Sequence, residues 1–180
     1  MHPFSLAQSV GYVAFVLGVA AFLQKSDRRL KGLNSCQSLV YGVHFALLGN
    51  PSAAASALLS GIRSYLSLKT RSPYLAALII VVNVALGFVL AKSAAGWLPV
   101  IGSCLATLAM FLMRGVRMRL MLLVSTSLWL TNNILSGSIG GTLLESTIAT
   151  INIITITRLL KERSRIRHPK PLPPPQPQQR

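Results

Sequence analysis

Polar side chains that could bind a small solute recur inside apolar stretches of the sequence, at spacings typical of one helix face. Gln37, Tyr41 and His44 are spaced i, i+4, i+7, and Trp129 and Asn133 are spaced i, i+4, so each group falls on one side of a helix. Aromatic rings and amides suit a neutral polyhydroxylated or amide-bearing solute. The predicted substrate-binding residues are Tyr41, His44, Trp129, Asn132, Asn133, Glu145 and Asn152.

Glu145 is the one formally charged residue between Leu120 and Thr157. Within a membrane, such a carboxyl group needs a cation or donor across the bundle, a water-filled cavity, or a proton. The first two would make it a structural lock or part of a site, where it could couple transport to a cation or proton. A plainer interpretation stays open for the other polar residues, in which amides and hydroxyls bond to a neighbouring helix and His44 is an interfacial or packing imidazole.

The composition is that of a membrane protein. Of the 180 residues, 52% are hydrophobic and only 3 are acidic, and the mean hydropathy is +0.56, which is too apolar for a soluble domain of this size. Apolar runs long enough to cross a hydrocarbon layer of ~30 Å as helices recur along the chain, without the alternation typical of membrane barrels. We therefore predict an all-α, polytopic membrane bundle of about seven transmembrane helices, over 4–23, 34–48, 52–68, 74–91, 97–113, 120–136 and 138–157.

Basic residues are concentrated in alternate connections. A net charge of +15 would suggest nucleic acid for a soluble protein, but most Lys and Arg follow the first, third, fifth and seventh spans, whereas the other connections contain only Lys92. Because basic loops stay in the cytoplasm, we predict an N-terminus outside, a cytoplasmic C-terminus and no nucleic-acid partner. We expect the first span to be an uncleaved anchor and Arg63 to extend along its helix to the cytoplasmic interface.

The chain contains a weak internal repeat. The stretch beginning at Tyr41 aligns with the one beginning at Trp129, and this places Gly49 on Gly137. Two parallel three-helix repeats joined by a linker helix, a 3+1+3 arrangement, form a transporter architecture with the site between the halves. We predict a membrane domain over 1–162, comprising a first unit (1–72), a linker helix (73–96) and a second unit (97–162), followed by a disordered, basic and proline-rich tail (163–180).

The segments "LAQSVGYVAFVLG", "GVHFALLGNPSAAASALLSGIRSYLSLKTRS", "LPVIGS" and "NNILSGSIGGTLLES" resemble the YgjV-type family of bacterial inner-membrane proteins. The resemblance covers nearly everything except the tail and implies a multi-pass protein of the bacterial inner (plasma) membrane. It also implies a distant relation to the PQ-loop and SWEET transporter superfamily. The Pro-Gln motif of that superfamily is half present, as Ala7-Gln8 and Pro99-Val100, so Pro99 is the one predicted hinge.

Other classes of protein have little support in the sequence. No Ser-His-Asp set, HExxH motif or phosphate-binding glycine loop is present, so we predict that the chain is not an enzyme and needs no cofactor or metal. Cys36 and Cys104 are predicted to be buried packing thiols. The favoured function is a transporter or facilitator of a small solute in the lipid bilayer, with a sugar-like solute as one candidate. The alternative is a non-transporting scaffold or assembly partner, and association into a homo-oligomer stays open.

Overall fold

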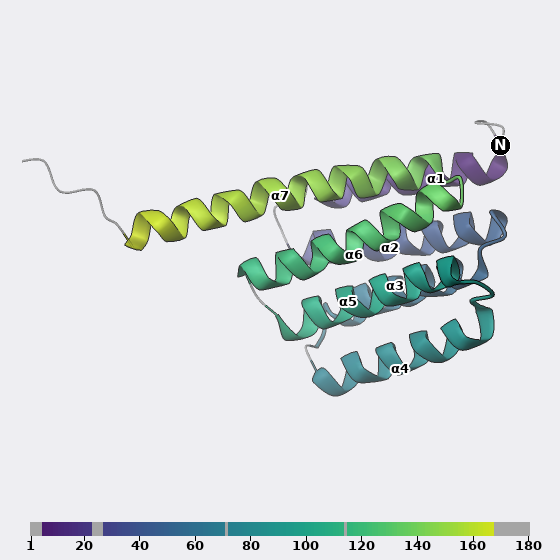
Figure 1. Ribbon diagram of the computed structural model, residues 1–180, viewed down its shortest axis with the longest axis horizontal. Helices are drawn as coiled ribbons and strands as arrows, with labels where there is room; N and C mark the ends of the chain where they lie inside the picture. Colours follow the sequence, from purple (N-terminus) through teal and green to yellow (C-terminus); the bar gives the residue numbers. More distant parts are fainter. Residues whose placement is uncertain (1–4, 23–26, 71, 114, 168–180) are drawn as a thin grey trace, which may run out of the picture.

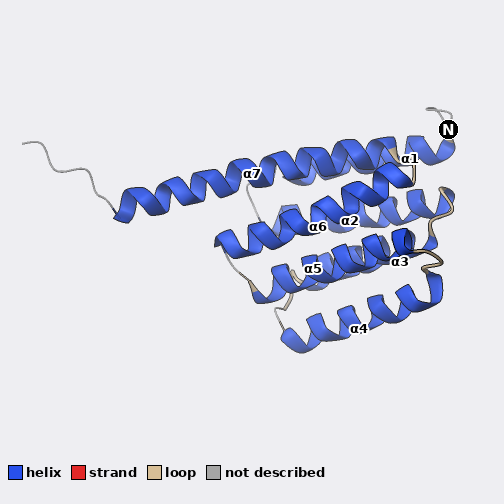
Figure 2. Cartoon of the chain, in the orientation of Figure 1, coloured by secondary structure: helices blue, strands red, loops and turns tan. Residues whose placement is uncertain are grey.

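A computed structural model describes residues 5–22, 27–70, 72–113 and 115–167, and this part of the chain is helical with no strand (Figure 2). The all-α prediction is confirmed for these residues. The helices are α1 (Leu6–Phe22), α2 (Asp27–Leu47), α3 (Pro51–Leu66), α4 (Pro73–Leu90), the 3-10 helix η1 (Ala94–Trp97), α5 (Leu98–Leu112), α6 (Gly115–Leu135) and α7 (Ile139–Arg167).

The helices form two facing layers (Figure 1). One layer is α1, α2 and α3 in that order, and the other is α7, α6 and α5, so that α1 packs on α7 and α3 packs on α5. Helix α4 lies at the edge where α3 and α5 meet and packs on both. It leaves large apolar side chains such as Phe88 and Val89 at 76% and 75% exposure, as expected for a helix that faces lipid.

Local sequence explains where several helices begin. Pro51, Pro73 and Pro99 lie in the first turns of α3, α4 and α5, where a proline has no helical hydrogen bond to lose. The chain leaves α2 through Gly49 and α6 through Gly137, with φ of +72° and +66°. This left-handed conformation favours glycine and ends a helix sharply.

Three helix boundaries differ from the sequence prediction. Helices α2 and α6 begin at Asp27 and Gly115, several residues before the predicted apolar spans, and α7 continues to Arg167. Residues 163–167 therefore extend a helix and do not belong to a disordered tail, while 168–180 lie outside the described residues. Lys, Arg and Glu are good helix formers, so a helix can outlast its apolar span when no Pro or Gly stops it.

Not every helix has the length and composition of a membrane span. Among the described residues, Pro73–Leu90, Ala94–Leu112 and Ile139–Lys161 are long and apolar enough to cross a bilayer, and Leu6–Ala21 is apolar but shorter. Helix α3 has only 16 residues, and α2 and α6 each have basic residues within their first five residues. The seven-span arrangement stays a prediction.

Small residues bring the two layers together. The small residues Gly11, Ala14 and Gly18 of α1 are buried. A Cβ on Gly140 of α7 would lie 2.5 Å from the Gly11 carbonyl oxygen, so the backbones of α1 and α7 are in direct contact. Such close approach is typical of helix association in membranes.

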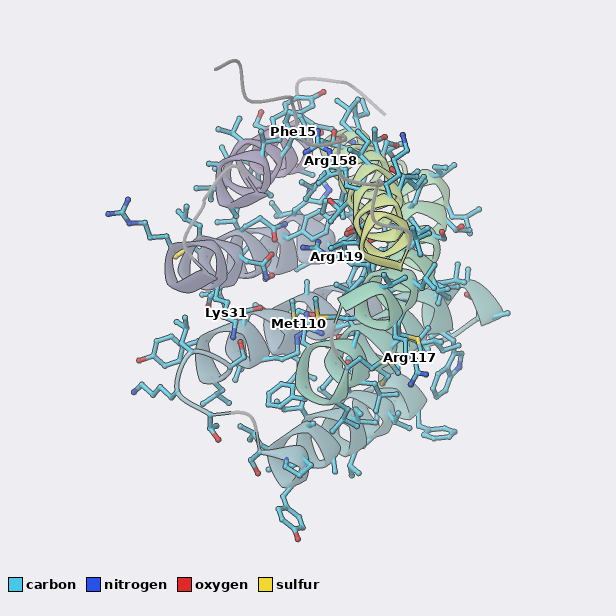
Figure 3. All side chains as sticks on the ribbon, turned by 90° about the vertical axis from the view of Figure 1, so that its left-hand side faces the viewer. Phe15, Lys31, Met110, Arg117, Arg119 and Arg158 are labelled. Atoms are coloured by element: carbon cyan, nitrogen blue, oxygen red, sulfur yellow. The ribbon has the colours of Figure 1, made fainter. Side chains whose placement is uncertain are left out.

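The two ends of the bundle differ in charge. Lys31, Arg117, Arg119 and Arg158 lie at the end where α2 and α6 begin, which we call the basic end (Figure 3). The opposite end, which we call the turn end, contains the α2–α3 and α6–α7 turns and has Lys92 as its only Lys or Arg among the described residues. Successive connections between helices therefore alternate between the basic end and the turn end, as the positive-inside rule expects of a multi-pass protein.

Reporter fusions should place the basic end in the cytoplasm. We expect fusions at Asn50 and Gly137 to report outside and fusions after Gly32 and Gly115 to report cytoplasm, because basic segments are retained on the cytoplasmic side. Paired alkaline phosphatase and green fluorescent protein fusions at each position would measure this. Cytoplasmic signals at both Asn50 and Gly137 would exclude the N-out orientation.

Candidate functional site

Aromatic rings fill the space between the middle helices of the two layers. Tyr41 and Phe45 of α2 are in edge contact with ring centroids 4.7 Å apart, and Trp129 of α6 lies 6.1 Å and 5.9 Å from them. All are buried. Tyr41 and Trp129 were predicted from sequence, and the structure brings them together at the centre of the bundle.

Two adjacent amides of α6 face the same region and have unused donors. The Tyr41 hydroxyl donates to Asn133 Oδ1 at 2.8 Å, and Asn50 Nδ2 donates to Asn132 Oδ1 at 3.0 Å. The Nδ2 atoms of both Asn132 and Asn133 are buried without a hydrogen-bond partner. Because an unpaired buried donor costs about 1–3 kcal/mol, these amides are suited to a ligand oxygen or a bound water.

A polar network joins the two layers at the turn end. Gln8 of α1 donates from Nε2 to the Gly137 carbonyl at 2.6 Å and accepts from the Ile139 amide at 3.1 Å. His44 Nε2 lies 2.7 Å from Ser138 Oγ, while its Nδ1 lies 2.6 Å from the Ala7 carbonyl. We call this set, with Asn50 and its bonds to Asn132 and Ser136, the turn-end network.

The turn-end network ties the α6–α7 turn to α1, α2 and the α2–α3 turn. His44 is fully buried within it, so the predicted site residue His44 is at the end of the bundle and has both ring nitrogens occupied. A shallow depression of about 340 Å³ on the neighbouring surface has Asn133 and Ser138 in its wall. The network therefore bonds the two layers together at this end of the bundle.

Glu145 points into the bundle from α7 and is 8% exposed. Its carboxyl group bonds to the Thr126 side chain of α6 and interacts electrostatically with Tyr41. It is the only acid among the described side chains, since those of Asp27 and Glu162 are not described. Glu145 therefore lies close to Tyr41, whose hydroxyl bonds to Asn133 of α6.

Asn152 is buried but belongs to a separate contact. Its Oδ1 accepts from Arg119 Nη1 of α6 at 3.1 Å. Asn152 follows Glu145 by two helical turns, roughly 10 Å along the axis, toward the basic end. The structure thus places Asn152 apart from the central residues Tyr41, Trp129, Asn133 and Glu145, and also apart from His44 and Asn132 in the turn-end network.

Arg63 does not extend to an interface, contrary to the sequence expectation. It is 5% exposed and donates from Nη1 to the Ser103 carbonyl and Thr107 Oγ1 of α5, both at 3.2 Å. Its Nε is buried without a partner. The α3–α5 contact is polar around it, because Ser60 bonds to Ser103. One turn earlier on α3, Ser56 bonds to Asn83 of α4.

Sequence reasoning missed Arg63 and Gln8 as interior residues. Ser52, Ser56 and Ser60 recur every four residues on α3, and Arg63 continues that face. A stripe of hydroxyls leading to an arginine is a signal for a buried polar face and could have identified it. Gln8 is fully buried, and a lone amide in the apolar first span was the corresponding signal.

Pro99 and the two cysteines have positions that bear on their predicted roles. Pro99 lies in the first turn of α5, where proline starts a helix and does not bend it, so the hinge role stays a prediction.

Cys36 is exposed on α2, which contradicts the prediction of a buried thiol, while Cys104 is partly buried and accepts from Asn83 at 3.4 Å. Cys36 directly precedes Gln37, the first residue of the buried polar face of α2. Because adjacent residues of a helix point in different directions, the Cys36 side chain faces outward.

Comparison with known proteins gives a consistent assignment. Residues 5–163 match the family model Imp-YgjV, described as "Bacterial inner membrane protein". The inner membrane protein YgjV of Escherichia coli (strain K12) is 39% identical over 165 residues, which cover 92% of this chain and 90% of that protein. No solved structure matches the chain.

Proposed function

The chain belongs to the Imp-YgjV family of bacterial inner membrane proteins, and we propose that it moves a small polar solute through a site between its two helical layers. The single observation that supports this most strongly is the pair of buried amide donors on Asn132 and Asn133. Asn133 accepts from the Tyr41 hydroxyl, which interacts electrostatically with the Glu145 carboxyl group, and Asn132 is the preceding residue of α6. Together these groups offer both donors and acceptors to a hydroxylated or amide-bearing solute.

An internal repeat supports a transporter architecture. The turn around Gly49 and the turn around Gly137 make the same backbone bonds, from Asn50 to Phe45 at 3.0 Å and from Ser138 to Asn133 at 2.9 Å. The pairs Phe45 and Asn133, Gly49 and Gly137, and Asn50 and Ser138 all have the same offset along the chain. We therefore infer that α1–α3 and α5–α7 are parallel three-helix repeats with α4 as the linker, the arrangement in which substrate sites lie between repeats.

The helix contacts support the inferred repeat. If α1, α2 and α3 correspond to α5, α6 and α7, then the contact of α3 with α5 corresponds to the contact of α7 with α1. Both contacts are present. The middle helices α2 and α6 then face each other across the axis, where Tyr41, Phe45 and Trp129 meet. A relation to the PQ-loop and SWEET superfamily is compatible with this inference and stays a prediction.

The two ends of the proposed path differ in closure. The turn-end network bonds the layers to each other, and we propose that a solute enters this conformation from the basic end. The Arg119–Asn152 pair lies on that side. Alternating access would require the turn-end bonds to break while contacts at the basic end form.

Cysteine accessibility tests whether water reaches the site. In a background lacking Cys36 and Cys104, we expect Asn132→Cys and Asn152→Cys to react with a membrane-impermeant thiol reagent added from the basic end, in inside-out vesicles. Their neighbours Thr131 and Ile153 are exposed on the outer surface, so Thr131→Cys and Ile153→Cys are controls at matched depth. Lipid shields the control thiols from such a reagent, so we expect them to be labelled at least about tenfold more slowly than the Asn132→Cys and Asn152→Cys thiols. A difference of about 1.4 kcal/mol in the activation barrier for labelling is sufficient for that ratio.

The outcome separates transport from the scaffold alternative. If the Asn132→Cys and Asn152→Cys thiols are as inert as those of their neighbours in folded protein, the interior is dry and a scaffold is favoured. Solute movement is measured directly as osmotic swelling of proteoliposomes in xylitol, glucose or N-acetylglucosamine. Swelling no faster than that of empty liposomes for every solute would contradict transport of this class.

A further inference from the structure

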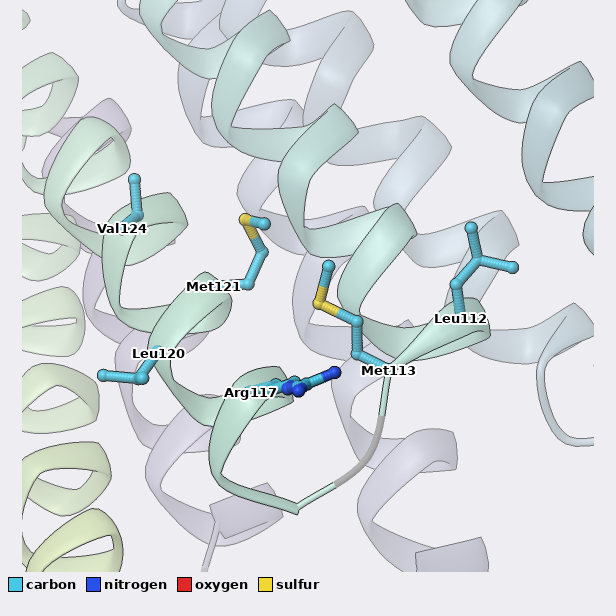
Figure 4. A pocket seen from close by; sticks show the side chains of 6 residues that line it. All are labelled: Leu112, Met113, Arg117, Leu120, Met121 and Val124. Atoms are coloured by element: carbon cyan, nitrogen blue, oxygen red, sulfur yellow. The ribbon is translucent and has the colours of Figure 1, made fainter.

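A groove opens between the ends of α5 and α6 on the outer surface at the basic end (Figure 4). Its volume is about 750 Å³. The chain leaves α5 after Leu112 and re-enters a helix at Gly115, so the two helix ends are joined by a very short connection and the groove lies beside it. The lining residues are Leu112, Met113, Arg117, Leu120, Met121 and Val124.

The α6 wall of the groove is one continuous helix face. Arg117, Leu120, Met121 and Val124 are spaced i, i+3, i+4, i+7, which places them in a row. Arg117 and Val124 are separated by about 10 Å along the axis at ~1.5 Å per residue. The wall is therefore cationic at the end of the bundle and apolar toward its middle.

The apolar part of the groove is open to the surroundings. Leu112, Leu120 and Val124 are 57%, 49% and 51% exposed, and they face outward from a protein of the inner membrane. Met113 and Met121 also line the groove (Figure 4). Unbranched thioether side chains adapt to irregular apolar partners, and a hydrocarbon chain is such a partner.

Arg117 has its guanidinium free for a ligand. Among the described residues it makes no hydrogen bond or ion pair, whereas Arg119, on another face of α6, is bonded to Asn152. Figure 4 shows the Arg117 side chain extending across the end of the groove toward Met113. A cation above an apolar channel is complementary to a phosphate attached to an acyl chain.

We propose that this groove binds one anionic phospholipid from the leaflet at the basic end, with its phosphate against Arg117 and an acyl chain along the α5–α6 wall. The net charge of +15 and the concentration of basic side chains at this end favour an anionic headgroup over a zwitterionic one. A soluble anion would use Arg117 but leave the apolar wall empty. The proposal requires only that the bundle lies in the membrane and does not depend on solute transport.

Native mass spectrometry of the full-length protein in detergent would test lipid binding. Phosphatidylglycerol and phosphatidylcholine with identical acyl chains are titrated, and the first phosphatidylglycerol should bind more tightly. Arg117→Gln should weaken that binding about fivefold, because one basic side chain near an anionic lipid contributes roughly 1 kcal/mol. Arg158→Gln removes a charge from an exposed position on α7 at the same end and should leave the affinity within about twofold.

A second variant tests the apolar wall without removing charge. Val124→Trp fills the groove at an exposed position, so it should fold normally and also weaken phosphatidylglycerol binding. Equal effects of Arg117→Gln and Arg158→Gln would show nonspecific attraction and overturn the proposal. Unchanged binding in Val124→Trp, or displacement of the lipid by millimolar inorganic phosphate, would identify a simple anion site and overturn it equally.

Discussion

Gly140→Ala is expected to lower the temperature at which the folded protein is lost, because the added Cβ would meet backbone atoms of α1. It would lie 2.5 Å from the Gly11 carbonyl oxygen and 3.0 Å from the Tyr12 nitrogen. Neither atom can move aside as a flexible side chain can, so α1 and α7 must separate. Overpacking of a filled interior costs about 1–3 kcal/mol, and we expect the upper part of that range.

The effect at Gly140 should be specific to that contact. Gly32 in α2 has no atom within 4 Å of its would-be Cβ, so Gly32→Ala adds the same methyl group without a clash. We expect Gly32→Ala to be neutral or slightly stabilising, because alanine favours helix over glycine by up to ~1 kcal/mol. The readout is monodisperse protein remaining after heating, followed by fluorescence-detected size-exclusion chromatography. Equal midpoints for the two variants would mean that α1 and α7 are not in backbone contact.

The arrangement of polar faces could be predicted from the sequence because helical periodicity fixes which residues share a side. Tyr41 and His44 are buried together on α2, and Trp129 and Asn133 on α6, as their spacing indicated. Periodicity within one helix does not say which other helix its face meets. The separation of Asn152 from the central amides, and its pairing with Arg119, depends on packing between helices and had no sequence signal.

Arg63 shows a different limit of sequence reasoning. Its distance from the basic end allowed a long side chain to reach water, and the length argument was sound for an isolated helix. In the bundle, the Ser103 carbonyl and Thr107 hydroxyl of α5 provide acceptors inside. The position of an arginine side chain depends on the hydrogen-bond acceptors near it. Here those acceptors are on α5, so they can be identified only once the packing of α3 on α5 is known.

Glu145→Gln should separate the electrostatic role of this carboxylate from its role in packing. Glu145 is buried against Thr126 of α6 and near Tyr41, and glutamine retains its shape and an acceptor oxygen. We therefore expect this variant to insert and fold like the wild type. Loss of a hydrogen bond or contact that depends on charge is worth about 1.5–3 kcal/mol, so solute flux should fall roughly ten- to hundredfold.

Glu145→Leu provides the contrasting case, since it also removes the polar contact with Thr126 and introduces a branched side chain into a packed interior. We expect reduced folded yield in addition to lost flux, because an unpaired buried hydroxyl costs about 1–3 kcal/mol. Ser146→Ala changes the next, exposed residue of α7 and is the control for both variants. Folded yield and proteoliposome swelling, measured side by side across a series of pH values, separate the role of Glu145 in transport from its role in packing. Wild-type flux for Glu145→Gln at every pH would show that ionisation of Glu145 is irrelevant to transport, and its assignment as a functional residue would then be wrong.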